Sequence, residues 1–314
     1  MNATLLLGRE DVERLLTHGA CIGAVEDAFR RLALGQVPPP GILGMHARDG
    51  GFHVKAGFLG CYFAAKINAN FPGNTELPTI QGAVILFDAT NGKPLAIMDS
   101  ISITALRTAA ASAVAVRYLA RPDCDTALIC GCGGQAAAQL EALRQVRTPR
   151  RVLAYDREPG RAAAFGRGTM PVHDLGEAVR ASDIVITCTT ATRYFIERDT
   201  VRAGTFIAAV GADNEHKQEI DPRLLAEAKV ITDLTEQAAR IGDLHHAIEA
   251  GVMTAADVHG ELGEVVAGRK PGRERADEII VFDSTGTGLQ DVAAAVAAYE
   301  HATKVRYSER AGAA

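Results

Sequence analysis

Apolar residues recur with two different spacings in the first hundred residues of the chain. Ile22, Val25 and Phe29 follow one another at intervals of three and four, which is the spacing of a helix that buries one face. Beyond three consecutive prolines the spacing becomes alternating, which predicts strands over 51–56, 62–67, 83–87 and 94–98. The Asn91-Gly92 pair between the last two runs is typical of a tight hairpin. We therefore expect an α+β region with antiparallel strands.

The pattern changes after residue 104. A helical run over 104–120 closes at Pro122, and short, continuously apolar segments then alternate with helical ones. Such strands are typical of a parallel sheet that helices cover on both faces. The predicted strands are 126–130, 151–155, 183–187, 206–210, 229–232 and 278–282, and the predicted helices include 134–146 and 289–302. The fold class is therefore α/β, a doubly wound parallel sheet joined to an α+β region.

Composition excludes several classes of protein. Lys plus Arg is 33 and Asp plus Glu is 38, so the net charge is −5 and no excess of cations attracts a nucleic acid. No uncharged apolar run approaches the roughly 18 residues that a membrane span needs, and the N-terminus lacks the pattern of a signal peptide. Six scattered cysteines without a CxxC pair favour free thiols in a reducing compartment. We expect a cytoplasmic protein that binds neither nucleic acid nor membrane.

A glycine-rich motif follows the strand that ends at residue 130. The sequence GCGGQA reads G-x-G-x-x-A, with Gly131, Gly133 and Ala136 in the small positions. The first allows a tight turn, the second lets backbone N–H groups approach a pyrophosphate, and the third lets the helix pack on the strand. Gly134 and Gln135 open that helix, whose N-terminal N–H groups bind phosphates. The motif predicts the phosphate loop of a Rossmann domain.

An acidic residue follows at the distance that this motif requires. Asp156 lies about twenty residues beyond the third small position, at the end of the next predicted strand. A carboxylate there accepts hydrogen bonds from the adenosine ribose and repels the 2′-phosphate of NADP. NAD is therefore the expected cofactor and NADP the less favoured one, although Arg157 and Arg161 beside the carboxylate weaken the preference. We include Arg157 among the cofactor-binding residues.

Further motifs occur in a fixed order on both sides of the phosphate loop. They are FPGN (71–74), LPTIQG (77–82) and TALRTAA (104–110) before it, and VGAD (210–213), KQE (217–219), GEV (263–265), GRKPGR (268–273) and FDSTG (282–286) after it. Together they resemble the ornithine cyclodeaminase/mu-crystallin family over nearly the whole chain. Within that family, the stretch 211–286 is most similar to archaeal-type alanine dehydrogenases.

The resemblance implies a domain organisation and an activity. It places an NAD-binding Rossmann domain at 121–287, and a substrate-binding and dimerisation domain at 1–120 with the returning helix 288–314, so we expect a homodimer. Members of the family move a hydride between the nicotinamide and the α-carbon of an amino or imino acid. We expect an NAD-dependent amino-acid dehydrogenase or imino-acid (ketimine) reductase with a small amino or imino acid as substrate. The alternatives are an ornithine cyclodeaminase, which returns the hydride and releases ammonia, and a mu-crystallin-like ligand binder without turnover.

The resemblance also assigns roles to individual residues. Lys66 and Asp213 match the catalytic lysine and aspartate, which exchange protons with the substrate nitrogen. Arg107 matches the arginine that binds the substrate carboxylate, for which a guanidinium fork is suited. Thr79 matches a threonine that contacts the substrate. The resemblance places Thr108, Ser284, Thr285 and Gly286 beside the cofactor.

Each of these residue types has an alternative role that its position alone leaves open. Arg107 could form a surface ion pair, Lys66 could guard an edge strand, and Asp213 could cap a helix. His245 and His246 could suggest a metal, but adjacent residues do not share a helix face, so we expect none.

One departure from the family concerns the strand that precedes the catalytic lysine. Many relatives carry an arginine thirteen residues before that lysine, where this chain has His53, and Lys55 follows on the same strand face. Pro40 and Gly41 also occupy a region in which many relatives have an arginine. Either Lys55 replaces the missing cation or the pocket takes a different substrate. His53 and Lys55 are therefore candidate substrate-binding residues.

Overall fold

The protein is described by a computed structural model that covers residues 3–312, with the backbone alone from 306 to 312. The chain folds into two compact units, which we describe separately. The first comprises residues up to Ala110 and those from Thr287 onward, and the second comprises Ala111–Gly286. The chain passes from the first unit to the second inside helix α3 (Ser100–Leu119), whereas the sequence analysis places the boundary after that helix, at 120/121.

The first unit is built on a six-stranded sheet in the order β1-β6-β5-β4-β3-β2. All neighbouring strands are antiparallel except β1 and β6, which are parallel. The strands are β1 (Leu5–Leu7), β2 (Gly41–Ala47), β3 (Gly50–Leu59), β4 (Tyr62–Asn70), β5 (Ile80–Asp88) and β6 (Pro94–Asp99), and the helices are α1 (Arg9–Leu15), α2 (His18–Ala33), α11 (Gly288–Gly312) and the first half of α3. The predicted α+β region with antiparallel strands is confirmed.

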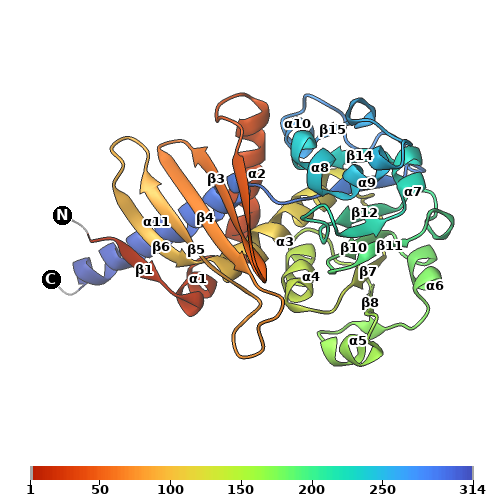
Figure 1. The fold of residues 1–314 in the computed structure, drawn as a ribbon, viewed down its shortest axis with the longest axis horizontal. Helices are drawn as coiled ribbons and strands as arrows, with labels where there is room; N and C mark the ends of the chain where they lie inside the picture. The colour runs from red at the N-terminus through yellow and green to blue at the C-terminus, as the bar shows by residue number, and fades with distance from the viewer. Residues whose placement is uncertain (1–2, 313–314) are drawn as a thin grey trace. The chain divides into compact units, whose positions relative to one another are not determined.

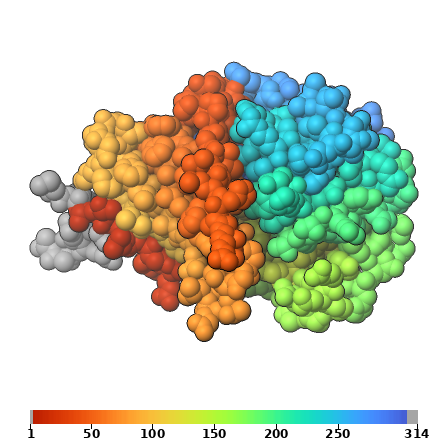
Figure 2. Space-filling view, viewed as in Figure 1, coloured from red at the N-terminus to blue at the C-terminus, as the bar shows by residue number. Residues whose placement is uncertain are grey.

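The two faces of this sheet are covered differently. On one face, alternate residues such as Ala64, Val84 and Met98 are buried, and α11 lies along β3 and β4 on that side (Figure 1). The opposite face is apolar and uncovered by the described residues of this unit, and Phe58 and Ile67 on it are 43% and 41% exposed. The strand β2 at the edge of the sheet is exposed along its whole length, and the orange surface of Figure 2 includes this edge.

The second unit is an eight-stranded sheet in which every neighbouring pair is parallel. Its order is β15-β14-β16-β12-β10-β7-β8-β9, which is the doubly wound arrangement that the continuously apolar strands predict. The strands are β7 (Thr126–Cys130), β8 (Arg151–Tyr155), β9 (Met170–Pro171), β10 (Ile184–Thr187), β12 (Phe206–Ala209), β14 (Lys229–Thr232), β15 (Gly260–Glu261) and β16 (Ile280–Asp283). A separate pair is formed by β11 (Thr192–Ile196) and β13 (Gln218–Ile220).

Helices flank the strands of this second unit. They are α4 (Gly134–Val146), α5 (Pro159–Phe165), α6 (Leu175–Arg180), α7 (Pro222–Glu227), α8 (Thr235–Ile241), α9 (Asp243–Glu249) and α10 (Leu262–Val266), with short 3₁₀ turns at Arg198–Thr200 and Ala255–Asp257. The core between strands and helices is aliphatic, and Leu128 on β7, Ile207 on β12 and Val281 on β16 are fully buried. None of the described helices is both long and apolar enough to cross a membrane.

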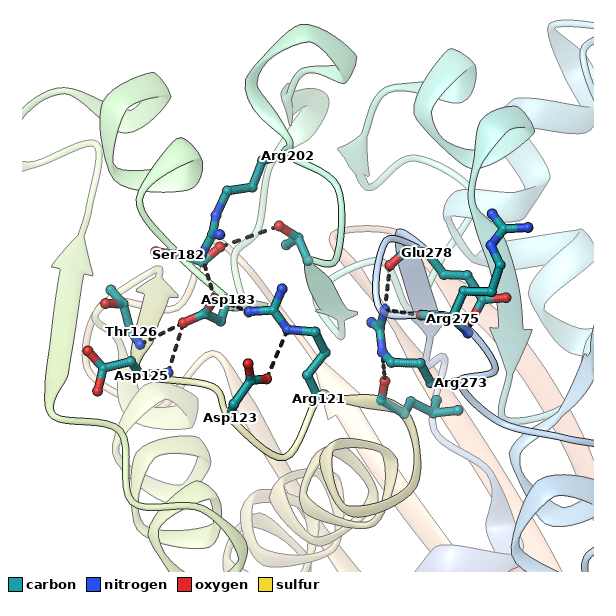
Figure 3. A network of polar contacts seen from close by, with 12 residues as sticks. Arg121, Asp123, Asp125, Thr126, Ser182, Asp183, Arg202, Arg273, Arg275 and Glu278 are labelled. Carbon is teal, nitrogen blue, oxygen red and sulfur yellow. Dashed lines mark hydrogen bonds and ion pairs between the residues drawn. The ribbon is translucent and has the colours of Figure 1, made fainter.

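A network of charged side chains lies at the end of this sheet where several strands begin (Figure 3). Asp183 directly precedes β10, and its carboxylate accepts hydrogen bonds from the backbone N–H groups of Asp125 and Thr126 at 2.8 and 3.0 Å. Arg121, at 2.8 Å, and Arg202 also pair with this carboxylate. Burial alone would raise the pKa of Asp183, but these hydrogen bonds and charges lower it. The network ties together the beginnings of β7, β10 and β12, at the end of the sheet away from the phosphate loop.

Candidate active site

In the first unit, three basic side chains surround one carboxylate that belongs to α11. We call Lys55, Lys66, Arg107 and Asp291 the cation cluster. Lys55 on β3 and Lys66 on β4 are directly paired across the two strands, so both side chains lie on the face that α11 covers. They are 8% and 3% exposed, and Arg107 on α3 is 5% exposed. Because Arg107 is buried, it does not form a surface ion pair. Lys66 does not guard an edge strand, because β4 is an inner strand of the sheet.

Asp291 holds two members of the cluster with one oxygen. Its Oδ1 lies 2.8 Å from Lys66 Nζ and 3.0 Å from Arg107 Nε. Arg107 also donates to Gln290 Oε1 at 2.9 Å, and Lys66 donates to Thr104 Oγ1 at 3.2 Å. Sequence analysis missed Asp291, which stands in an alanine-rich helix. Lys66 lies in the middle of β4 rather than at the end of a strand, because β4 continues to Asn70.

Two glycines bring Asp291 close to the sheet. A Cβ at Gly288 would lie 2.3 Å from the carbonyl oxygen of Ala56, and a Cβ at Gly57 would lie 3.2 Å from the backbone of Gly288. The first turn of α11 therefore packs directly on β3, which only glycine allows at such distances. This contact places Asp291, the acidic residue in the first turn of α11, within hydrogen-bond distance of Lys66.

The environment of Lys66 makes it suitable for proton transfer. Burial, together with the charges of Arg107 and Lys55, lowers the pKa of Lys66 from 10.5 to about 7, even though the charge of Asp291 acts in the opposite direction. Burial would by itself raise the pKa of Asp291, but the charges of Lys66, Arg107 and Lys55 hold it below its ordinary value. At neutral pH the cluster thus contains an ionised carboxylate and a lysine that both gains and loses a proton.

The remaining candidate residues of the first unit lie on three elements. His53 stands on β3, two residues from Lys55 and on the same face of the sheet. Thr79 lies in the exposed loop before β5, where its carbonyl accepts a hydrogen bond from the N–H of Phe71. Thr108 follows Arg107 on α3 and is buried.

The second unit contains a cavity of about 600 Å³ at the phosphate loop. Gly131 adopts φ +91°, and a Cβ there would lie 2.8 Å from the side chain of Thr189, so this position requires glycine. Gly133 and Gly134 have open space where a Cβ would stand, which leaves room for a phosphate at the start of α4. Ala136 is fully buried against the strand, as the motif predicts. Gln135 is half-buried in the first turn of the same helix.

Asp156 lines this cavity at the end of β8. Its Oδ2 accepts a hydrogen bond from the N–H of Cys132 at 2.8 Å, and its Oδ1 accepts one from the N–H of Glu158 at 2.9 Å. The carboxylate is therefore held against the phosphate loop by backbone groups and keeps lone pairs for ribose hydroxyls. Arg157 is exposed and lines the same cavity. These residues fit a dinucleotide whose ribose meets an acidic side chain.

The loop after β16 is fixed by a carboxylate that sequence analysis missed. Asp233 is 1% exposed and accepts hydrogen bonds from Ser284 Oγ, Thr285 Oγ1 and the N–H of Gly286, at 3.3, 3.0 and 2.7 Å. Gln237 on α8 donates to Thr285 Oγ1 and to the carbonyl of Gly286. The loop that the family resemblance places beside the nicotinamide is thus rigidly held.

A second buried carboxylate organises the loops after β10 and β12. Glu219 is fully buried and accepts hydrogen bonds from Thr187 Oγ1, from the N–H of Thr189 and from the N–H of Gly211, at 2.6, 2.7 and 2.8 Å. Burial raises its pKa, and these hydrogen bonds counteract the effect. Glu219 shows in the sequence only as part of the KQE motif, which carries no indication that its side chain is buried.

Asp213 follows the loop that Glu219 organises. Its side chain is 51% exposed and pairs with Lys217 at 2.7 Å. No helix begins within the following eight residues of the described chain, so Asp213 is not a helix cap. His245 and His246 lie on α9, and His246 Nε2 is 2.9 Å from the carbonyl oxygen of Lys217.

Comparison with known proteins places the chain in a family. The sequence model of the ornithine cyclodeaminase/mu-crystallin family matches residues 2–306. The chain belongs to this family. Alanine dehydrogenase of Archaeoglobus fulgidus is 39% identical to it over 306 residues, with 95% of each chain covered.

Solved structures of similar proteins share the fold of the chain. One is an archaeal alanine dehydrogenase dimer with bound NAD, with a TM-score of 0.93, 39% identity, and coverage of 96% of this chain and 97% of that one. Another is the Thermococcus litoralis Δ1-pyrroline-2-carboxylate reductase in complex with NADH and L-proline, with a TM-score of 0.90, 35% identity, and coverage of 96% and 98%. The predicted α/β fold, with its Rossmann domain, is confirmed.

Proposed function

We propose that this member of the ornithine cyclodeaminase/mu-crystallin family is an NAD-dependent amino-acid dehydrogenase or imino-acid reductase. The observation that carries the proposal is the cation cluster, in which a buried lysine with a pKa of about 7 shares one carboxylate oxygen with a buried arginine. A pure binding protein does not need a lysine that titrates at neutral pH, whereas proton transfer to an imine nitrogen does. The similarity to an alanine dehydrogenase and to an imino-acid reductase supports the same reaction.

The residues of the cluster have separate tasks in this reaction. Arg107 and Lys55 bind the carboxylate of the substrate, with Arg107 oriented by Asp291 and Gln290. Lys66 as an ammonium gives its proton to the imine nitrogen, and as a neutral amine it accepts that proton in the reverse direction. When bound, NADH supplies the hydride to the imine carbon and is oxidised, so that a C=N bond becomes CH–NH.

The remaining candidate residues complete the proposal. Asp213 assists proton exchange at the substrate nitrogen, and His53 and Thr79 contact the substrate. The residues that would hold the dinucleotide are Gly131, Gly133, Gly134, Gln135, Ala136, Asp156, Arg157, Thr108, Ser284, Thr285 and Gly286. Asp156 favours NAD over NADP, because its carboxylate repels a 2′-phosphate.

The uncovered apolar face of the first unit supports a homodimer. Leu43 on β2, Phe52 and Phe58 on β3, and Ile97 on β6 are all more than a third exposed on this face. The rings of Phe58 and Phe63 lie 4.9 Å apart, and those of Phe63 and Phe87 lie 6.1 Å apart, which extends an aromatic row across three strands. A second copy that covers this face removes a large apolar patch from water. The six free cysteines fit the cytoplasm as the compartment of such an enzyme.

The experiment that tests the proposal is an absorbance assay of NADH with a panel of substrates. The panel contains alanine, ornithine, pyruvate with ammonia, and cyclic imino acids, and proline and ammonia are followed in parallel. A net change of NADH with an amino or imino acid is the expected result. Proline and ammonia formed from ornithine without a net change of NADH would assign a cyclodeaminase instead, and binding without turnover of any compound would overturn the proposal.

A further inference from the structure

Asp291 contacts both Lys66 and Arg107. In the proposed function, Lys66 transfers the proton and Arg107 binds the substrate carboxylate. One of its oxygens, Oδ1, lies 2.8 Å from Lys66 Nζ and 3.0 Å from Arg107 Nε. The side chain is 1% exposed, and its other oxygen, Oδ2, is buried without a hydrogen-bond donor among the described residues. Burying a carboxylate in this way is costly, and the cost is offset only by the groups that it contacts.

We propose that Asp291 is a positioning residue that holds Lys66 and Arg107 in one fixed geometry and increases the fraction of Lys66 that is protonated at neutral pH. The inference rests on the proposed function, since it concerns the residue that delivers the proton. Asp291 acts through these two side chains, so we do not assign it a contact with the substrate.

The titratable groups in and around the cation cluster come from four elements. Lys55 lies beside it on β3, Arg107 faces it from α3, and Asp291 faces it from α11. Cys21 on α2 is close enough to feel the charge of Arg107, but burial raises the pKa of its thiol to about 12, so it is neutral. Asp291 is therefore the member of this set whose charge favours the ammonium form of Lys66. The other charges, and burial, favour the neutral amine.

The position of Asp291 on its helix explains how it stays ionised. It lies in the first turn of α11, a helix of 25 residues, where the helix dipole favours a negative charge. The close packing of Gly288 on β3 fixes this turn against the sheet. A carboxylate held by a rigid helix start is a suitable anchor for two long, flexible side chains, because the entropy of ordering them is already lost before a substrate binds.

A titration of Lys66 without substrate or cofactor tests the inference directly. The chain has seven lysines, so protein labelled with ¹³C at lysine Cε gives few NMR signals, and Lys66→Arg assigns the one of interest. In Asp291→Asn we expect the pKa of Lys66 to fall by about one to three pH units, the effect of removing an adjacent opposite charge. The matched control is Gln290→Ala, which removes a neighbour of Arg107 from the same turn and leaves the Lys66 contact intact. An unchanged titration of Lys66 in a folded Asp291→Asn protein would overturn the inference.

The pH dependence of turnover gives a second readout. In Asp291→Asn, the alkaline limb of kcat/KM for imine reduction is expected to shift to lower pH, with at least a tenfold loss near pH 8. Asp291→Glu is expected to restore part of the wild-type profile, and Asp291→Ser replaces the amide variant if that fails to fold. A variant that loses activity equally at every pH would show a merely structural role and overturn the inference. Absence of turnover in the wild-type enzyme would instead overturn the proposed function, and the NMR titration would remain valid.

Discussion

The buried lysine of the cation cluster has a measurable cost in stability. The pKa of Lys66 is about 7 in the folded protein and 10.5 in an exposed lysine. Between these values the unfolded chain binds a proton that the folded chain does not, so the free energy of unfolding rises with pH across this window. The penalty is fully present below pH 7 and vanishes above pH 10.5. At 1.36 kcal/mol per pH unit it amounts to about 5 kcal/mol.

Lys66→Met removes this penalty and keeps nearly the same volume. We expect the free energy of unfolding of the wild type, relative to that of the variant, to fall by about 3 kcal/mol between pH 9.5 and pH 6. The pH dependence of this difference isolates the titration, because the lost packing and the lost contact with Asp291 contribute a nearly constant offset.

The measurement is a series of urea titrations followed by far-UV circular dichroism at several pH values. Lys93→Met, on the exposed turn between β5 and β6, corrects for the loss of one lysine. A difference between wild type and Lys66→Met that stays constant from pH 6 to pH 9.5 would refute the reasoning. A difference of opposite slope would show that the folded protein favours the ammonium form, and that Asp291 outweighs burial.

Two further predictions concern the cofactor and the assembly. Asp156→Ala is expected to weaken NADH binding about tenfold, because hydrogen bonds to a charged acceptor are lost, while NADPH binding changes less. Fluorescence titration measures the affinity for both cofactors. An equal loss of affinity for the two would contradict the assignment of Asp156 to the ribose. Phe58→Glu is expected to give a monomer in size-exclusion chromatography with light scattering, because a charge in the aromatic row cannot be buried without a partner. Phe58 is 43% exposed, so the unit itself tolerates the change, and a persisting dimer would show that the second copy binds elsewhere.

Sequence patterns predicted the features that depend on local chemistry. The phosphate loop was found because its glycines have a local cause: Gly131 has a positive φ and Gly133 leaves open space. The parallel sheet followed from continuously apolar strands such as 126–130, which are buried on both faces. The strand β2 was missed. All of its residues are exposed, so its sequence does not alternate between buried apolar and exposed polar positions.

The partners of the site residues could not be found in the same way. Asp291 is 225 residues from Lys66 in the sequence and stands in a helix whose alanines indicate only burial. Asp233 and Glu219 likewise accept hydrogen bonds from loops that lie far from them in the sequence. Those loops carry no charge pattern that would indicate the contact. A carboxylate that serves as a hydrogen-bond acceptor inside a fold has no periodicity, so its role depends on tertiary contacts that only the structure shows.

The same physical cause links the stability cost of Lys66 to the proposed reaction. A lysine on the surface keeps its proton near pH 7, and in an apolar core without a carboxylate it loses its charge altogether. The cation cluster lies between these limits, because burial and two neighbouring cations oppose one carboxylate. A substrate carboxylate that binds Arg107 adds a second negative charge, which favours the ammonium form when a proton is about to be needed. We therefore expect a bound carboxylate to raise the pKa of Lys66. It follows that such a ligand stabilises the wild-type protein more at pH 8 than it stabilises Lys66→Met.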